Sequence, residues 1–181
     1  MLNLAEKDIS CLRTLLGYSL RCYSSARLSI YDKYSVSYDG VLALRFSRAN
    51  EHKTMVLKGM DFFESLWGKI YHDYSIEYEN TTSDNAEVYL NTSPIIEIGV
   101  YGKEYNPEEF KAYPSVYAKQ NEVKTTDEVF IFKCKNGENI TVGFDSISPS
   151  IDVWHYNNIE HYVTLEDDKP YTLNYSITIN S

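Results

Sequence analysis

Two of the four histidines, His155 and His161, flank Glu160 and form the group best suited to metal or acid–base chemistry. The three side chains could assemble a small site if one strand ran unbroken through them. Their spacing matches none of the common zinc arrangements, and Asn157-Asn158 between them favours a turn. We therefore expect surface polar residues here and no metal site.

Other signatures of catalysis are as weak. Glu122-Val123-Lys124 has the compact form of one nuclease motif, but it lies in a polar segment without a convincing Asp upstream. The sequence holds neither a glycine-rich phosphate loop nor a Gly-x-Ser-x-Gly turn. Cys134 lies in an apolar strand pattern, where a thiol is a core residue, and Cys11 and Cys22 are too far apart for a CxxC motif. We expect free thiols, no catalytic residues, no cofactor and no enzymatic activity.

Charge gives a clearer signal than any motif. The 181 residues carry a net charge of −9, but residues 1–58 hold nine bases and five acids, so the acidity lies in the remainder. From Asn136 to Asp168 there are seven acids and no Lys or Arg. Such a field repels nucleic acid and anionic lipid and attracts basic proteins, although a solvated face kept for solubility is the simpler alternative.

The acidic run also carries large aromatic side chains, in a chain with 17 tyrosines. Exposed Tyr and Trp beside acids make good interface anchors, whereas a Trp in the core would contribute to stability instead. We predict that most of the surface that contacts a partner comes from Asp145, Asp152, Trp154, Tyr156, Glu160, Glu166, Asp167 and Asp168.

The elements that must position these residues indicate a single α+β domain over residues 1–181, with an N-terminal helix on a mostly antiparallel, strand-rich sheet. Asn3 and Glu6 have the spacing of a capping box, and the apolar spacing that follows predicts a helix over residues 4–16 that ends at Gly17. Apolar periodicity over residues 61–72 predicts a second helix, with a pair of bulky strands as the alternative.

Most of the remaining chain has the alternation of β-strands. Asp39-Gly40 and Asn136-Gly137 each join two strand-like runs, which predicts two hairpins. Pro107 could begin one short helical turn within a polar stretch. The runs with strand character are residues 18–22, 28–30, 34–38, 41–46, 54–57, 74–79, 86–90, 95–101, 129–135, 139–144, 151–156 and 171–179.

Nothing in the sequence predicts export or a membrane span. The longest apolar runs are only a few residues, as at Val41-Leu42-Ala43-Leu44, and the N-terminus carries acids where a signal peptide needs bases. We therefore expect a cytoplasmic protein.

Residues 135–162 read as a β-hairpin that leads through Ser148-Pro149-Ser150 into an acidic, aromatic strand with Asp152, Trp154 and Tyr156. Together with the size, acidity and early helix, this stretch resembles the immunity proteins of bacterial polymorphic-toxin and contact-dependent inhibition systems. That resemblance implies a small α+β protein that occludes a basic toxin domain and has no catalysis of its own.

The sequence is therefore compatible with three functions. The first is a protein inhibitor of the immunity class, whose carboxylates pair with the Lys and Arg that a toxin nuclease uses for phosphates. The second is an anti-defence protein from a phage or another mobile element that mimics nucleic acid. The third is a small-ligand-binding β domain or an unrecognised enzyme with a pocket among the tyrosines.

Overall fold

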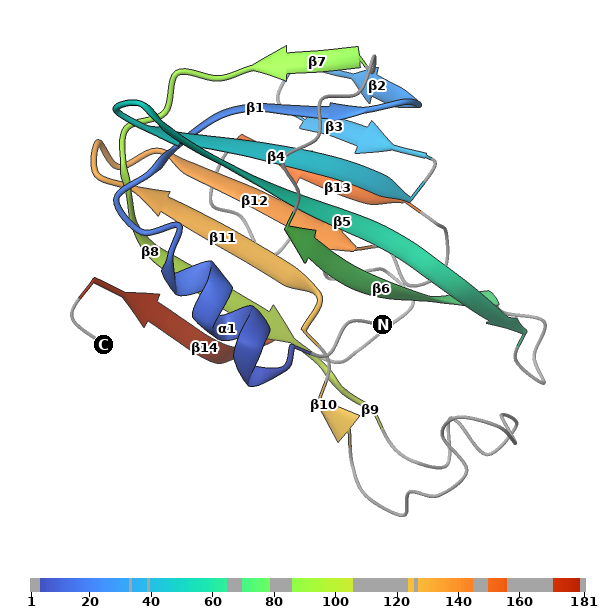
Figure 1. Ribbon diagram of the computed structural model, residues 1–181. Helices are drawn as coiled ribbons and strands as arrows, with labels where there is room; N and C mark the ends of the chain where they lie inside the picture. The colour runs from blue at the N-terminus through green and yellow to red at the C-terminus, as the bar shows by residue number, and fades with distance from the viewer. Residues whose placement is uncertain are drawn as a thin grey trace.

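Two antiparallel β-sheets face each other in the computed structural model, which describes residues 4–32, 34–38, 40–64, 70–78, 86–105, 124–125, 127–144, 150–155 and 171–179 (Figure 1). The five-stranded sheet has the order β6 (Ile70–Tyr78), β5 (Glu51–Glu64), β4 (Val41–Arg48), β1 (Ser19–Ser25) and β7 (Ala86–Tyr89). The seven-stranded sheet has the order β14 (Thr172–Thr178), β8 (Ile95–Gly102), β11 (Val129–Cys134), β12 (Asn139–Phe144), β13 (Ile151–Trp154), β3 (Tyr34–Ser37) and β2 (Leu28–Ile30). A short pair, β9 (Glu104–Tyr105) and β10 (Lys124–Thr125), extends beyond β8.

The hydrophobic core lies between the two large sheets because alternate residues of each strand point inward. In β4 the buried positions are Leu42, Leu44 and Phe46, whereas the residues between them are partly exposed. Phe46 faces the other sheet and lies 5.8 Å from the ring of Phe132 on β11. The inward faces of β8, β11, β12 and β13 complete one continuous apolar cluster.

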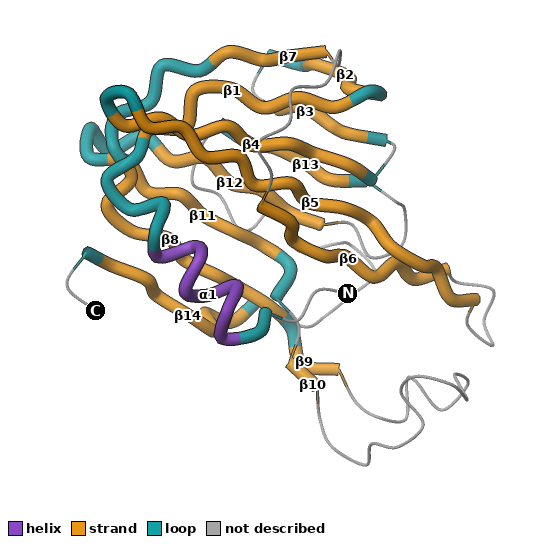
Figure 2. Tube along the Cα trace, in the orientation of Figure 1, coloured by secondary structure: helices purple, strands orange, loops and turns teal. Residues whose placement is uncertain are grey.

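Helix α1 (Glu6–Arg13) lies beside the five-stranded sheet and covers the end of the seven-stranded sheet where β14 and β8 lie (Figure 2). Leu12 and Leu15 are buried in the common core. The carboxylate of Asp8 accepts a hydrogen bond of 3.0 Å from the backbone N–H of Ala5. Ala5 and Asp8 therefore cap the start of the helix, in place of the predicted pair Asn3 and Glu6. The early helix and the antiparallel sheets together confirm the expected α+β class.

The second helix predicted near residues 61–72 is wrong wherever the structure describes that range. Residues 61–64 belong to β5 and residues 70–72 to β6, and Phe63 pairs with Tyr71 across an antiparallel ladder. The run of bulky aromatic residues fits both periods, and pairing between two long strands prevails over helix propensity.

The hairpin predicted at Asp39-Gly40 is also wrong. Gly40 does adopt a positive φ of 68°, as that turn chemistry requires, but β3 and β4 belong to different sheets. β3 pairs with β2 and β13, whereas β4 pairs with β1 and β5. By contrast, the Asn136-Gly137 hairpin is confirmed, because β11 and β12 pair directly from Lys133–Asn139 onward. The helical turn expected after Pro107 lies outside the described residues.

Candidate functional site

The outer face of the seven-stranded sheet brings two of the predicted contact residues together. In β13, Ile151 and Val153 are buried between the sheets, so Asp152 and Trp154 lie on the opposite, outer face. The neighbouring strand β3 pairs Val36 with Asp152 and Tyr34 with Trp154. The other six predicted contact residues, Asp145, Tyr156, Glu160, Glu166, Asp167 and Asp168, lie outside the described residues.

Three aromatic rings stack on this face. The ring of Trp154 lies 4.4 Å from that of Tyr34 with the planes 17° apart, and the ring of Tyr31 lies 4.3 Å from Tyr34 with the planes 10° apart. The tight turn between β2 and β3, closed by a hydrogen bond of 2.8 Å from Tyr31 N–H to Tyr34 C=O, places Tyr31 at the end of the stack. Tyr31 remains 45% exposed, so the stack presents a ring at its outer end.

A fourth ring and a carboxylate complete this group. Tyr38 is 46% exposed, and its pKa is raised first by a side-chain hydrogen bond with Tyr31, with further contributions from the nearby Tyr34 and the negative charge of Asp152. We call Tyr31, Tyr34, Tyr38, Asp152 and Trp154 the aromatic cluster. The raised pKa keeps the Tyr38 phenol protonated at neutral pH, and the rings of the cluster supply hydrogen-bonding hydroxyls and apolar contact area.

The inner end of the aromatic cluster is anchored by apolar packing. Trp154 also packs, with Tyr101 and Tyr171, against the buried side chains of Val129 and Ile131 on β11. The ammonium group of Lys103 lies 4.5 Å from the centre of the Tyr171 ring, which is a cation–π contact. Trp154 is therefore half-buried, so it contributes both to stability and to the outer surface.

Beneath the aromatic cluster, polar side chains connect the two sheets. The buried hydroxyl of Tyr23 on β1 shares hydrogen bonds with Ser35 Oγ (2.7 Å) and His155 Nε2 (3.0 Å). Ser25 and Ser37 share another of 2.7 Å. We call Tyr23, Ser25, Ser35, Ser37 and His155 the polar seam. Burial lowers the pKa of His155, so the ring is neutral at pH 7.

The polar seam explains why β3 does not pair with β4 in the hairpin predicted at Asp39-Gly40. Between β1 and β2 the chain crosses from the five-stranded to the seven-stranded sheet, and between β3 and β4 it crosses back at the same end of the molecule. Inward-facing serines at these crossings bond to one another, and Ser37 Oγ also donates to the carbonyl of Val41 at 2.8 Å. These bonds satisfy polar groups that would otherwise be buried without partners.

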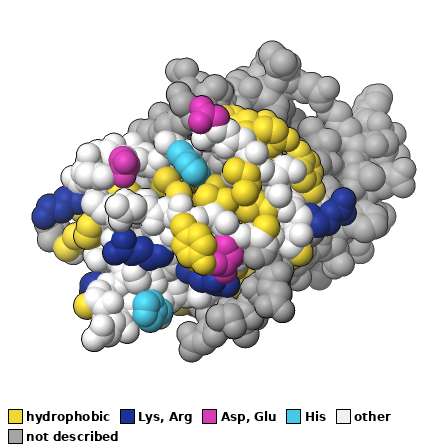
Figure 3. All heavy atoms as spheres, turned by 90° about the horizontal axis from the view of Figure 1, so that it is seen from above, with side chains coloured by type: hydrophobic (Ala, Val, Ile, Leu, Met, Phe, Trp, Pro, Cys, Tyr) yellow, Lys and Arg dark blue, Asp and Glu magenta, His cyan; other side chains and the backbone are white. Residues whose placement is uncertain are grey.

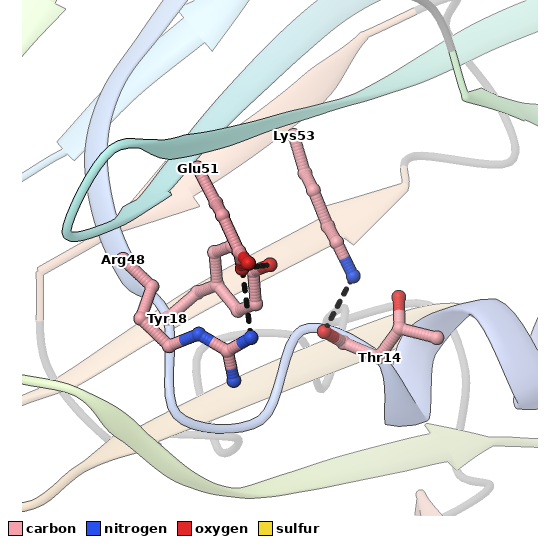
Figure 4. A network of polar contacts seen from close by, with 5 residues as sticks. All are labelled: Thr14, Tyr18, Arg48, Glu51 and Lys53. Atoms are coloured by element: carbon pink, nitrogen blue, oxygen red, sulfur yellow. Dashed lines mark hydrogen bonds and ion pairs between the residues drawn. The ribbon is translucent and has the colours of Figure 1, made fainter.

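A separate polar network lies around Tyr18, at the C-terminal end of α1 (Figure 4). The phenol donates to the carboxylate of Glu51, which also accepts a hydrogen bond of 2.7 Å from Arg48. The ammonium group of Lys53 lies 4.6 Å from the centre of the Tyr18 ring and donates to Thr14 C=O at 2.9 Å.

The hydrogen bond to Glu51 raises the pKa of Tyr18, and the bonds from Tyr18 and Arg48 lower the pKa of Glu51. A phenol that holds its proton this firmly cannot act as a base near neutral pH. We assign the network a structural role, because it joins the β4–β5 hairpin to the end of α1.

Within the described ranges, no three His, Cys, Asp or Glu side chains are grouped so that they could hold a metal ion. His155 bonds to Tyr23, and its predicted neighbours Glu160 and His161 lie outside those ranges. The three cysteines are free thiols, as expected, and burial raises the pKa of Cys22 and Cys134, which keeps both thiols protonated.

The surface at the β7 and β2 end of the sandwich is shown in Figure 3. Hydrophobic side chains gather near the middle of the described surface, with acidic and basic side chains placed around them. Exposed large hydrophobic residues on these two edge strands include Ile30 on β2 and Tyr89 on β7. The aromatic cluster lies next to β2 on the outer face of the larger sheet.

Comparison with protein-family models, curated proteins and solved structures finds no match for this chain. No helix in the described part of the chain is long and apolar enough to cross a membrane.

Proposed function

We propose that this chain is a cytoplasmic protein inhibitor of the bacterial immunity class, which binds a basic toxin domain and blocks its active site without catalysis. The aromatic cluster on the outer face of the seven-stranded sheet supplies the contact surface. The observation that carries the proposal is the stack of Tyr31, Tyr34 and Trp154, with Asp152 on the same face.

This arrangement suits the side chains that a basic partner offers. An Arg guanidinium or Lys ammonium can lie over an exposed ring face, and a carboxylate beside the ring can accept its hydrogen bonds. Tyr and Trp are also the residue types that most often dominate binding energy at protein interfaces. The stacked rings are held by one another and by Trp154 packing, so binding orders few side chains and loses little entropy.

Charge supports the same kind of partner. The net charge of −9 attracts a basic domain over a distance of about one Debye length, roughly 8–10 Å at physiological salt. Acids at the rim act mainly on the association rate, whereas buried rings act mainly on the dissociation rate. We therefore assign the association rate mainly to the acidic run 136–168 and the dissociation rate mainly to the aromatic cluster.

The proposed function predicts that a neighbouring gene encodes a basic, toxin-like domain, and the test uses that domain as a purified protein. Tyr31→Ala and Tyr38→Ala are each expected to weaken binding about tenfold or more, mainly through faster dissociation, because they remove exposed rings from the centre of the contact. Tyr89→Ala is the matched control, since Tyr89 is 77% exposed and lies on the edge strand of the other sheet. Equal affinities for all three variants and the wild type, with the fold retained, would place the contact elsewhere.

A further inference from the structure

The three stacked rings of the aromatic cluster follow the order of the strands that position them (Figure 1). Trp154 lies on β13, Tyr34 lies opposite it on β3, and Tyr31 directly follows β2, where its N–H donates to Tyr34 C=O. The ring centres are 4.4 and 4.3 Å apart, close to the spacing of about 4.7–4.9 Å between neighbouring strands. Each strand at this edge of the sheet therefore sets the position of one plane in the stack.

The stack ends at Tyr31 because the sheet ends at β2. No described strand of the seven-stranded sheet lies beyond β2. Among the described residues, Tyr34 alone stacks on Tyr31, and Tyr31 is 45% exposed. The face of the Tyr31 ring that is turned away from Tyr34 therefore offers a place for a fourth planar group.

Negative charge near Tyr31 selects the kind of planar group. Asp32 follows Tyr31 in the chain and is exposed, and the charge of Asp152 acts on Tyr38, which is hydrogen-bonded to Tyr31. A guanidinium is planar, stacks on aromatic rings and donates from its edge to carboxylates, whereas an ammonium is a compact and strongly hydrated charge. An aromatic side chain or a nucleobase would stack as well, but it would gain nothing from the two carboxylates.

We infer, on the basis of the proposed function, that Tyr31 binds an arginine side chain of the basic partner, whose guanidinium lies flat on the ring as the fourth plane of the stack. Tyr34 and Trp154 act as positioning residues, because their rings hold the ring of Tyr31 in place. Since a lysine side chain has no planar group to stack, the aromatic cluster distinguishes a partner with arginine at this position from one with lysine.

Two labelled and capped peptides, hexa-arginine and hexa-lysine, test this without the toxin-like domain. Both peptides carry the same charge, so general attraction to a chain with a net charge of −9 affects them alike. Fluorescence anisotropy at about 150 mM salt is expected to show that the wild type binds hexa-arginine about threefold or more tightly than hexa-lysine, in the range that a cation–π contact supplies at an exposed site.

Three variants assign this preference to the ring of Tyr31. Tyr31→Leu removes the ring and is expected to bind the two peptides equally. Tyr31→Phe loses the bond to Tyr38 but keeps the ring, so it is expected to retain the preference. Tyr89→Leu, which makes the same change at an exposed tyrosine on the edge strand of the other sheet, is the matched control and should also retain it.

Circular dichroism checks that each variant is folded, and Tyr31→Gln replaces Tyr31→Leu if the latter does not fold. Equal affinity of the wild type for the two peptides would overturn the inference. A preference for arginine that persists without the Tyr31 ring would overturn it as well, because the arginine would then be bound elsewhere. Either result leaves the proposed function standing, since Tyr31→Ala can weaken binding of the toxin-like domain without any preference for arginine.

Discussion

Replacing Tyr23 with Phe tests whether the polar seam holds the two sheets together behind the aromatic cluster. The substitution keeps the ring in the core but removes the hydroxyl that bonds to Ser35 Oγ at 2.7 Å and to His155 Nε2 at 3.0 Å. Both Tyr23 and Ser35 are fully buried, so water cannot replace the lost bonds without rearrangement. The structure thus predicts a loss of two buried hydrogen bonds with little loss of apolar contact.

Each such bond contributes about 0.5–1.5 kcal/mol, so Tyr23→Phe is expected to lower the free energy of unfolding by about 1–3 kcal/mol. A loss of about 2 kcal/mol corresponds to a fall in Tm of roughly 4–8 °C for a chain of this size. Urea unfolding followed by far-UV circular dichroism measures the change. Tyr31→Phe is the control, because its phenol is 45% exposed, and it is expected to cost less than about 0.5 kcal/mol.

A double-mutant cycle with Ser35→Ala separates the hydrogen bond from general packing. Tyr23→Phe leaves the Ser35 hydroxyl buried without this partner, and removing that hydroxyl as well relieves the penalty. The double variant should therefore be more stable, by about 1 kcal/mol, than the sum of the single losses predicts. Additive losses, or a loss below about 0.5 kcal/mol for Tyr23→Phe alone, would refute the role given to the polar seam.

Three further outcomes are expected. Burial lowers the pKa of His155, so below the ordinary histidine pKa of about 6.5 the unfolded chain binds a proton that the folded chain does not, and the free energy of unfolding falls. His155→Gln should therefore flatten the fall in stability that urea unfolding measures between pH 7 and 5. Asp127 accepts hydrogen bonds from Leu4 N–H and Asn174 Nδ2, yet burial raises its pKa, so the folded chain holds the proton more tightly than the unfolded chain. The stability of the wild type relative to Asp127→Asn should therefore increase as the pH falls from 7 to 5, and an unchanged difference would be the contrary result. Gly17 has a φ of 81° and its N–H donates to Ile95 C=O at 2.8 Å, so Gly17→Ala should cost about 1 kcal/mol in the same assay, and a neutral effect would contradict the strain expected there.

Elements set by local chemistry are predictable from this sequence. Asn136-Gly137 supplies the positive φ that a tight turn between two antiparallel strands needs, and Gly137 has a φ of 87° in the structure. The first helix follows from its apolar spacing, although its cap lies at Ala5 and Asp8, because more than one acid in the first turn could close it.

Strand partners are not set locally, and the errors arise there. Asp39-Gly40 has the same turn chemistry as Asn136-Gly137, but Ser35 and Ser37 bond to β1 across the sandwich, and β3 therefore joins the other sheet. Residues 61–72 carry bulky side chains that suit a helix and a strand alike, so only the pairing of β5 with β6 decides between them.

The candidate site shows the same limit. The shared face of Asp152 and Trp154 follows from the period of two in a strand and is visible in the sequence. Tyr31 and Tyr34 join them only because β3 pairs with β13 from more than a hundred residues away in the chain, and no local pattern predicts that pairing.

Hydrogen–deuterium exchange of the chain, alone and with the purified toxin-like domain, tests most directly whether the aromatic cluster is the contact surface. We expect slower exchange in residues 28–38 and 150–155, which carry the cluster, and unchanged exchange in residues 86–90 on the edge strand of the other sheet. Protection confined to the five-stranded sheet, with residues 28–38 and 150–155 exchanging as in the free chain, would contradict the assignment of the aromatic cluster as the contact surface.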